Sequence, residues 1–578
     1  MIQIRERTQM NANGYRLVVY TRRPQPDYSS YLGHSIHFAV GTEEHLNTLF
    51  HGYGRLFAEC SFSKENGIVS HGIRDITLFC SGSIYIICGI ETVRRVENGV
   101  TEEEDTGTVL RWSTEDFSVF SGPSRMNAPL DGMDSAGLEQ AVPAEPSHLP
   151  EGADAGVEIR LPQTLAESLL RQNARVRFSF LTLPDTAEIS SPGDLDRITA
   201  AVHYTDGSLH YKKIKWNVEP LAAGKEVKVH GRIQVRRFPF PVEPHPWGDP
   251  VIFYTRGKYY FIATDDTDGN RSFRIREADS PETLFTDTAR RSVSTLLDAE
   301  HSRFGGTFWA PEFHEIDGKL HIFCALSEKG RGFDPQAHVI TLRDGGNLMD
   351  PSEWDEPKRC VMPDGRFLNQ NPLGDGKGGI TLDMTCFEAG ENHYAVWSYR
   401  TWEGCDSGSM LMIARIDPRE PWKLTSFPRL LSRPVYAWEH NKVTDNNEGP
   451  FAIVTGGMVF LSYSGGSAGE DTYAVGLLTA RADADLCDPS VWTKSGTPVL
   501  ASGFVEGQFG CGHNAFFTDE YGDCYITYHG HDTLKPSPRL VGIRRVHFGR
   551  DDVPVFDMSD EDDLPREEEE VTIMVKWK

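Results

Sequence analysis

The stretch WGDPVIFYTRGKYYFIAT, residues 247–264, decides the fold of the larger part of this chain. An acidic residue, Asp249, opens a short apolar run, and a turn glycine, Gly257, separates this run from a second one rich in β-branched and aromatic residues. Two such runs around a glycine turn predict a β-hairpin. A fold assembled from similar hairpins shows itself as an internal repeat.

The same layout recurs in the segments that start at residues 309, 382, 446 and 511, and a third strand-like run follows each hairpin. The polar anchors lie 63, 71, 65 and 65 residues apart and are Asp249, Glu312, Asp383, Glu448 and His513. Short strands repeating at this period predict the blades of a propeller. We therefore predict an all-β chain with a five-bladed β-propeller over residues 240–555, in which the first strands bring the anchors to one central axis.

The flanking regions also have β-like patterns. Residues 1–120 contain a blade-like hairpin with Asp75 and Gly82 and are predicted to form an N-terminal β-domain. Residues 121–150, rich in Pro, Gly, Ala and acids, are interpreted as a linker or surface loop. Residues 151–237 carry a YTDGS hairpin and a Trp-bearing strand, which resemble a small Ig-like β-sandwich, and residues 556–578 form an acidic tail that ends in a docking strand.

The composition restricts the possible partners and location. A formal net charge of −26 argues against binding to nucleic acid or to an anionic membrane surface. No stretch reaches the roughly 20 apolar residues that a membrane span needs. No apolar segment follows the charges in MIQIRERTQM, so we predict no secretory signal and a cytoplasmic location. The ten cysteines contain no C-x-x-C pair and are predicted to be reduced thiols.

Three of the five anchors are acids that suit one kind of chemistry. Hydrolysis of a glycosidic bond usually needs two carboxyl groups, one that protonates the leaving oxygen and one that activates water or attacks carbon. The two must differ in pKa, and a like-charged neighbour or an apolar setting raises the pKa of a carboxyl group. Asp249, Asp383 and Glu448 are sufficient for such a site.

The motifs WGDP, WAPE, LDMT, NNEGP and GHN, in this order and spacing, resemble glycoside hydrolase family 43, in its α-L-arabinofuranosidase and β-xylosidase-like branch. The resemblance covers about residues 243–565 and implies an inverting mechanism. It implies that Asp249 is the general base, Glu448 the general acid, and Asp383 the residue that modulates the pKa of the acid. It gives Glu312 of WAPE a structural or supporting role.

Further residues are candidates for contact with sugar or metal. Aromatic side chains stack on sugar rings, and the candidates for pocket walls are Trp247, Phe308, Trp309, Tyr399, Trp402 and Phe509. Arg545 resembles a sugar-contacting arginine of the family. His513 resembles a histidine on the propeller axis, beside which a structural calcium ion is possible; no other cofactor is predicted.

Together these observations predict an inverting, exo-acting α-L-arabinofuranosidase that acts on arabinose- or xylose-containing oligosaccharides or glycan side chains. A β-xylosidase or an arabinanase of the same fold is the alternative within the enzymes. A non-catalytic sugar-binding propeller is the alternative from another class, because fold alone does not establish activity. The oligomeric state is not predicted.

Overall fold

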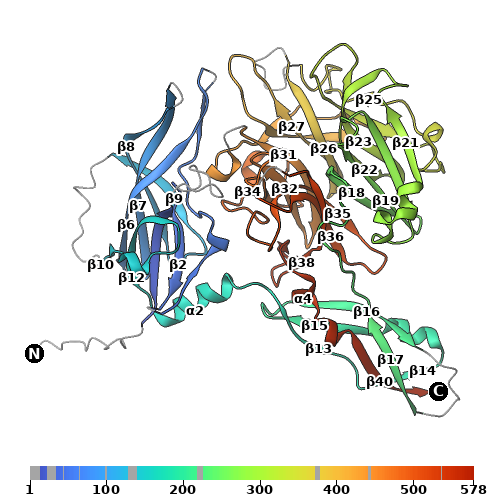
Figure 1. Cartoon of the computed structure of the whole chain (residues 1–578), viewed down its shortest axis with the longest axis horizontal. Helices are drawn as coiled ribbons and strands as arrows, with labels where there is room; N and C mark the ends of the chain where they lie inside the picture. Colours follow the sequence, from blue (N-terminus) through green and yellow to red (C-terminus); the bar gives the residue numbers. More distant parts are fainter. Residues whose placement is uncertain are drawn as a thin grey trace, which may run out of the picture. The chain divides into compact units, whose positions relative to one another are not determined.

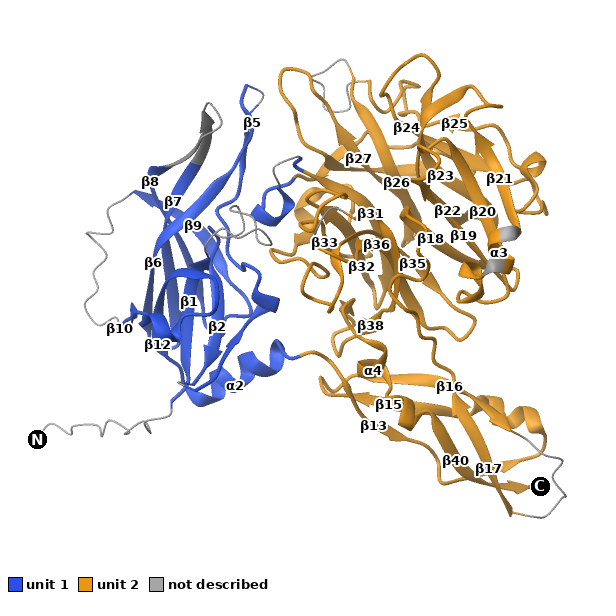
Figure 2. Cartoon of the chain, viewed as in Figure 1, with its two compact units in different colours: residues 1–174, 434–445 blue, residues 175–433, 446–578 orange. Residues whose placement is uncertain are grey.

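The computed structural model describes residues 14–22, 34–42, 44–63, 65–97, 100–127, 139–217, 226–370, 378–440, 444–534 and 537–578. Strands dominate throughout (Figure 1), so the chain is all-β as predicted. It forms two compact units, residues 1–174 with 434–445 and residues 175–433 with 446–578 (Figure 2). No helix in the described ranges is long and apolar enough to cross a membrane.

The first unit contains two five-stranded sheets with one core and a two-stranded sheet of β4 (Ser61–Ser63) and β5 (Gly67–Val69). One five-stranded sheet has the order β11-β12-β1-β2-β3 and the other the order β10-β6-β7-β8-β9. Leu17 and Val19 of the first sheet and Leu78 and Ile87 of the second belong to the same cluster of buried side chains. The strand bounds are β1 Arg16–Arg22, β2 His37–Gly41, β3 Leu46–Thr48, β6 His71–Ser81, β7 Ile84–Glu97, β8 Val100–Thr114, β9 Ser121–Asn127, β10 Glu139–Gln140, β11 Val142–Pro143 and β12 Ala153–Arg160.

The boundary of this unit differs from the predicted one. β12 pairs along its length with β1, and helix α2 (Gln163–Gln172) buries Ala166 and Leu169 in the same core. Because these contacts lie beyond residue 150, the unit continues to residue 174 and no boundary falls at 120 or 150. Part of the predicted linker, residues 128–138, lies outside the described residues.

One short segment from far along the chain also belongs to the first unit. The backbone N–H of Cys60 donates to the carbonyl of Val435 at 2.8 Å, and the ring of Phe57 packs on Tyr436 with centroids 5.4 Å apart. Residues 434–445 are therefore grouped with the first unit, where Val435 and Tyr436 contact the segment 57–60, and the repeat pattern did not predict this.

The second unit begins with a small sheet of six strands in the order β13-β15-β16-β17-β40-β14. The bounds are β13 Phe178–Thr182, β14 Thr186–Ile189, β15 Thr199–Tyr204, β16 Leu209–Asn217, β17 Glu226–Ile233 and β40 Glu570–Trp577. The final strand of the chain thus docks between β17 and β14 (Figure 1). Alternate side chains of β40 are buried, as expected for a sheet with one apolar face. A two-sheet Ig-like sandwich is not confirmed, because these strands lie in a single sheet.

The remainder of the second unit contains five consecutive antiparallel sheets, the arrangement of a β-propeller. Their strands are β18 Trp247–Thr255, β19 Lys258–Asp265, β20 Ser272–Ala278 and β21 Val293–Asp298; β22 Phe304–Ile316, β23 Lys319–Glu328, β24 Gln336–Thr341 and β25 Lys358–Arg359; β26 Ile380–Ala389, β27 Asn392–Arg400, β28 Met410–Asp417, β29 Glu420–Leu424 and β30 Arg429–Ser432; β31 Asn447–Thr455, β32 Met458–Gly465, β33 Ala474–Arg481 and β34 Thr493–Lys494; and β35 Phe509–Thr518, β36 Cys524–His531 and β37 Leu540–Arg545.

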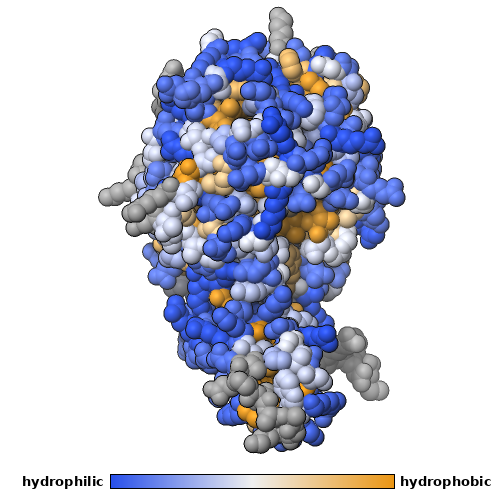
Figure 3. Space-filling model, turned by 90° about the vertical axis from the view of Figure 1, so that its right-hand side faces the viewer, coloured by the Kyte–Doolittle hydropathy of each residue, from blue (hydrophilic) through white to orange (hydrophobic). Residues whose placement is uncertain are grey.

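The first strands of these sheets lie against one another in a closed series. β18 contacts β22, β22 contacts β26, β26 contacts β31, β31 contacts β35, and β35 returns to β18. Polar groups on these strands therefore meet around one axis. The outer surface is mainly hydrophilic on the face drawn in Figure 3, with small separate apolar patches.

Candidate active site

The same backbone irregularity occurs in the first strand of every sheet of the propeller. Each strand has a register shift near its start, and β22 and β35 have two, with glycines of positive φ (Gly306 and Gly510) at their first shifts. At the shift nearest the predicted anchor, one residue of each strand has a positive φ. These residues are Asp249 (φ 55°), Ala310 (φ 43°), Asp383 (φ 51°), Gly449 (φ 53°) and His513 (φ 45°). A bulge with positive φ re-aims the side chains next to it, and non-glycine residues in this conformation carry strain of about 1–3 kcal/mol that is typical of functional sites.

The positions of these bulges correct the predicted alignment of the repeats. Glu448 lies one residue before the bulge of its strand, and Glu312 lies two residues after Ala310, so neither is equivalent to Asp249. The predicted anchors still meet near the axis, because a bulge turns the side chains of neighbouring positions in new directions.

A cavity of about 220 Å³ lies at these bulges. Five of the predicted residues line it: Asp249, Asp383, Glu448, Trp309 and His513. Four further residues complete the lining and were not predicted: Asn270, Leu382, Ala468 and Arg539.

Asp249 is held in its ionised form. Its Oδ2 accepts a hydrogen bond from Thr264 Oγ1 at 2.6 Å, and its Oδ1 lies 2.9 Å from Arg539 Nη1 and 3.1 Å from His513 Nδ1. Burial raises the pKa of this carboxyl group, but the charges of His513 and Arg539 outweigh burial and leave the pKa below its usual value. The backbone N–H of Asp249 donates to Nδ1 of His529 at 3.2 Å, which fixes this carboxylate in the cavity.

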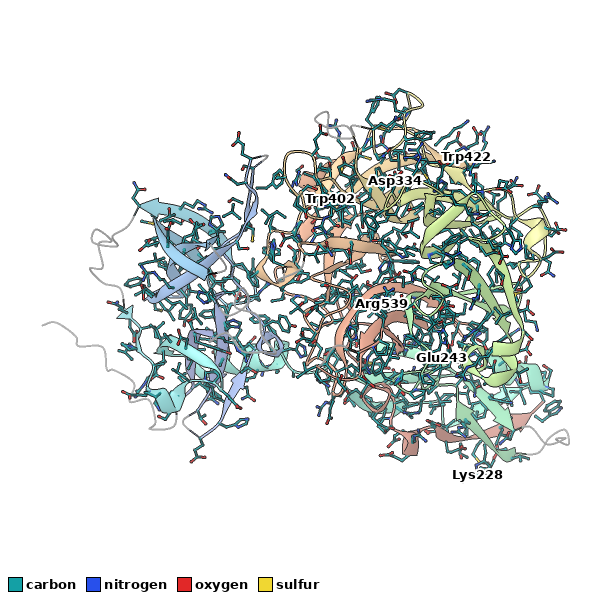
Figure 4. The ribbon with its side chains drawn as sticks, turned by 45° about the horizontal axis from the view of Figure 1, so that its top comes forward. Lys228, Glu243, Asp334, Trp402, Trp422 and Arg539 are labelled. Carbon is teal, nitrogen blue, oxygen red and sulfur yellow. The ribbon has the colours of Figure 1, made fainter. Side chains whose placement is uncertain are left out.

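Arg539 is the most informative of the unpredicted residues. It lies directly before β37, and its guanidinium bridges Asp249 and Asp266, with Nη2 2.6 Å from Asp266 Oδ1 (labelled in Figure 4). This approach requires a glycine at position 248, where a Cβ would lie 2.0 Å from the guanidinium carbon. The glycine of WGDP thus makes room for the cation that accompanies Asp249. In the sequence, the one signal that could have identified Arg539 is its position directly before the third strand of the fifth repeat.

Glu448 is held in the opposite state. Burial and the neighbouring charge of Asp383 raise its pKa to about 7, against the weaker opposing effects of His513 and Tyr473. The Tyr473 hydroxyl donates to Glu448 Oε1 at 2.9 Å, and the Tyr473 ring stacks on His529 with centroids 5.4 Å apart. At position 512 a Cβ would lie 2.3 Å from this ring, so the glycine of GHN is needed for Tyr473 to reach Glu448.

Asp383 is fixed between its neighbours. Its Oδ2 accepts hydrogen bonds from Ser398 Oγ at 3.1 Å and from the backbone N–H of Gly449 at 3.2 Å. The second bond ties Asp383 to the residue that follows Glu448. Burial, and also the charge of Asp249, raise the pKa of Asp383.

His513 and Glu312 lie on the same axis. Burial lowers the pKa of His513, but the surrounding carboxylates, first Asp249 and Asp383, raise it above its usual value overall. Glu312 is 3% exposed, its Oε2 is 2.9 Å from His314 Nε2, and burial raises its pKa well above normal. It does not line the cavity, and its predicted supporting role stays a prediction.

The possible axial calcium has little support from the protein atoms. Nε2 of His513 is buried without a hydrogen-bond partner, which leaves one ligand position available. Calcium prefers six to eight oxygen ligands, and the described residues contain no group of three or more His, Cys, Asp or Glu side chains placed to hold a metal. The described residues therefore do not form a calcium cage.

Several predicted wall residues lie outside the cavity. Phe308 is fully buried and packs edge-on against Phe273, because neighbouring strand residues point in opposite directions and Trp309 takes the cavity side. Tyr399 is 1% exposed in the core between the second and third sheets. Trp247 is buried, and its indole N–H donates to Glu243 at 2.7 Å. Phe509 is partly buried at the start of β35 but does not line the cavity.

Arg545 was predicted to contact sugar, and the structure contradicts this role. Its Nη1 lies 2.6 Å from Asp563 Oδ1 and its Nη2 3.5 Å from Asp523 Oδ1. Lys212 of the small sheet joins the same carboxylates, at 2.9 Å from Asp563. The third strand of a blade lies away from the axis, so its side chains face other parts of the unit. Arg545 therefore links the fifth sheet to the small sheet and the C-terminal segment.

Comparison with known proteins places these features in one family. Residues 238–554 match the family model of Glycosyl hydrolases family 43, and the chain belongs to this family. Relatives include the extracellular exo-α-(1→5)-L-arabinofuranosidases of Streptomyces avermitilis, 32% identical over 321 residues (53% of this chain, 61% of that protein), and of Streptomyces chartreusis, 31% identical over 316 residues (53% and 88%). The crystal structure of an α-L-arabinofuranosidase from Lactobacillus brevis is 31% identical, covers 55% of this chain and 96% of that one, and has a TM-score of 0.46.

The matched region spans about 61% of the Streptomyces avermitilis relative. The predicted cytoplasmic location is contradicted, because both Streptomyces relatives are named extracellular. The prediction relied on the first residues of the sequence alone.

Proposed function

We propose that the protein is an inverting glycoside hydrolase that releases terminal α-L-arabinofuranosyl residues from arabinose-containing oligosaccharides or glycan side chains. The observation that carries this proposal is the divergence of two carboxyl groups in one cavity. Asp249 has a lowered pKa and Glu448 a pKa of about 7. Carboxyl groups whose environments separate their pKa values in this way act as base and acid.

The proposed reaction follows from these states. Asp249 accepts a proton from a water molecule while the oxygen of this water attacks the anomeric carbon. Glu448 donates its proton to the glycosidic oxygen as the carbon–oxygen bond breaks, and the anomeric configuration inverts. Asp383 raises the pKa of Glu448 and, through Gly449, fixes its strand. Exchange with solvent then returns both carboxyl groups to their starting states.

The size and architecture of the site support action on a chain end. The five sheets are proposed to be the five blades of one propeller, with the cavity at its axis. A volume of about 220 Å³ is below the roughly 300–1,000 Å³ of drug-sized sites, and suits a single sugar unit. The names of the relatives favour arabinofuranose over xylose for this unit.

The test compares hydrolysis of an aryl α-L-arabinofuranoside with that of an aryl β-D-xyloside, using Glu448→Gln and Asp249→Asn as variants. We expect cleavage of the arabinoside, release of the inverted anomer in proton NMR, and a loss of about 10²–10⁴-fold in kcat for each variant. Circular dichroism checks that the variants remain folded. Near-normal turnover in either folded variant contradicts the assigned roles, and preference for the xyloside contradicts the assigned sugar.

A further inference from the structure

A row of three aromatic rings leads outward from the cavity. Trp309 lines the cavity and its indole N–H donates to Asn270 Oδ1 at 2.8 Å. The Phe333 ring lies 5.6 Å from Trp309 at 63°, and the Trp402 ring lies 6.4 Å from Phe333 at 68°. Phe333 belongs to the loop between β23 and β24 and Trp402 to the loop between β27 and β28, so two sheets contribute to the row.

The outer two rings are exposed, although they are large and apolar. Phe333 is 59% and Trp402 49% exposed. Single exposed apolar residues are ordinary, but contiguous ones that border a cavity indicate a binding surface. Figure 4 labels Trp402 and also Asp334, the neighbour of Phe333, on their two loops.

Trp402 is fixed in place in spite of its exposure. Its indole hydrogen-bonds to Asp406, and the guanidinium of Arg400 lies over its ring at 5.4 Å. Arg400 in turn donates to Asp406 at 2.8 Å and to Asn446 at 3.3 Å, two residues before Glu448. A ring held in this way loses little conformational entropy when a ligand covers it. These contacts orient the Trp402 ring but leave it 49% exposed, so the ring is available to an external partner.

We propose that Trp309, Phe333 and Trp402 form a stacking platform for the sugar units that follow the terminal residue, so that the enzyme prefers oligosaccharide chains to short substrates. The proposal rests on the proposed function, because it takes the cavity as the site of the terminal sugar. A glycan presents flat apolar faces and hydroxyl edges, which suits aromatic rings with a polar rim better than a purely apolar ligand does. Charged residues accompany the rings here: Arg331 and Asp334, which lie 3.9 Å apart, flank Phe333 in the sequence, and Arg400 lies over the Trp402 ring.

The experiment measures kcat/KM for α-(1→5)-linked arabino-oligosaccharides of two and four units. The ratio of the tetramer value to the dimer value is compared among the wild type, Phe333→Ala, Trp402→Ala and the control Phe427→Ala. Phe427 is 54% exposed and does not line the cavity. We expect the wild type to favour the tetramer, and each platform variant to lower the ratio by about threefold to tenfold, the effect of one aromatic contact. The control keeps the wild-type ratio.

Each result decides the proposal. A wild type that cleaves dimer and tetramer equally, or platform variants that keep the wild-type ratio, overturns the platform while leaving the proposed function intact. A wild type that cleaves no α-L-arabinofuranoside overturns the proposed function. In that case, affinity electrophoresis in soluble arabinan and in arabinoxylan tests the platform alone: retardation that is lost in Trp402→Ala supports it, and the absence of retardation overturns it.

Discussion

Replacement of Arg539 by methionine tests how the cavity keeps its base ionised. Arg539 and His513 provide the charges that overcome the effect of burial on Asp249. Without the guanidinium, burial has more influence, so the pKa of Asp249 rises. The acid limb of the kcat/KM profile, which reports ionisation of the base in the free enzyme, then moves to higher pH.

The same substitution has a calculable effect on stability. Asp249 and Asp266 both lose a charged hydrogen-bond partner, and the Asp249 carboxylate is only 7% exposed. Removal of one partner from a buried pair costs about 3–5 kcal/mol of unfolding free energy. A carboxyl group with a lowered pKa stabilises the fold at pH values above its unfolded pKa, and this contribution is lost as the pH falls through the folded pKa. The difference between variant and wild type is therefore present at neutral pH and shrinks in acid.

The assays are pH-dependent kinetics on an aryl arabinofuranoside and urea unfolding at pH 7 and in acid. The matched control is Arg481→Met, which removes an exposed arginine that pairs with the exposed Asp483 outside the cavity. We expect a loss of about 0–1 kcal/mol and an unchanged acid limb for the control. An acid limb that does not move in Arg539→Met would refute the reasoning.

Three further substitutions test the remaining parts of the site. Asp383→Asn removes a like charge, so the pKa of Glu448 falls from about 7 towards its ordinary 4.5. The alkaline limb of the activity profile then moves to lower pH, and an unmoved limb contradicts the role of Asp383 in raising this pKa. Tyr473→Phe removes a donor that favours ionised Glu448, so the alkaline limb moves to higher pH; a downward shift contradicts it. Gly248→Ala displaces Arg539 and reproduces the kinetic effect of Arg539→Met; a normal acid limb shows that the guanidinium tolerates the methyl group.

The repeat and its acids could be predicted because they depend on local pattern. Apolar runs, turn glycines and a polar residue at a constant period indicate repeated hairpins, and Asp249, Asp383 and Glu448 reach one cavity as predicted. The one-residue difference between Glu448 and the true bulge position could not be predicted, because positive φ occurs there at a glycine that precedes a proline and resembles an ordinary turn.

Side-chain direction and long-range pairing depended on the tertiary structure. Phe308 and Trp309 are adjacent aromatic residues, and only the register of β22 decides which one enters the cavity. Arg539 and Arg545 lie six positions apart, but their separate partners, Asp249 and Asp563, come from the first strand of the first propeller sheet and from the C-terminal segment.

The sequence by itself determined the all-β class, the repeat and the identity of the carboxyl groups, because these follow from local periodicity and residue chemistry. Only the tertiary structure decided their protonation states and companions. A pKa depends on burial and on charges that lie within a few ångströms, and residues such as Arg539 and Tyr473 reach Asp249 and Glu448 only after the sheets have packed around their common axis.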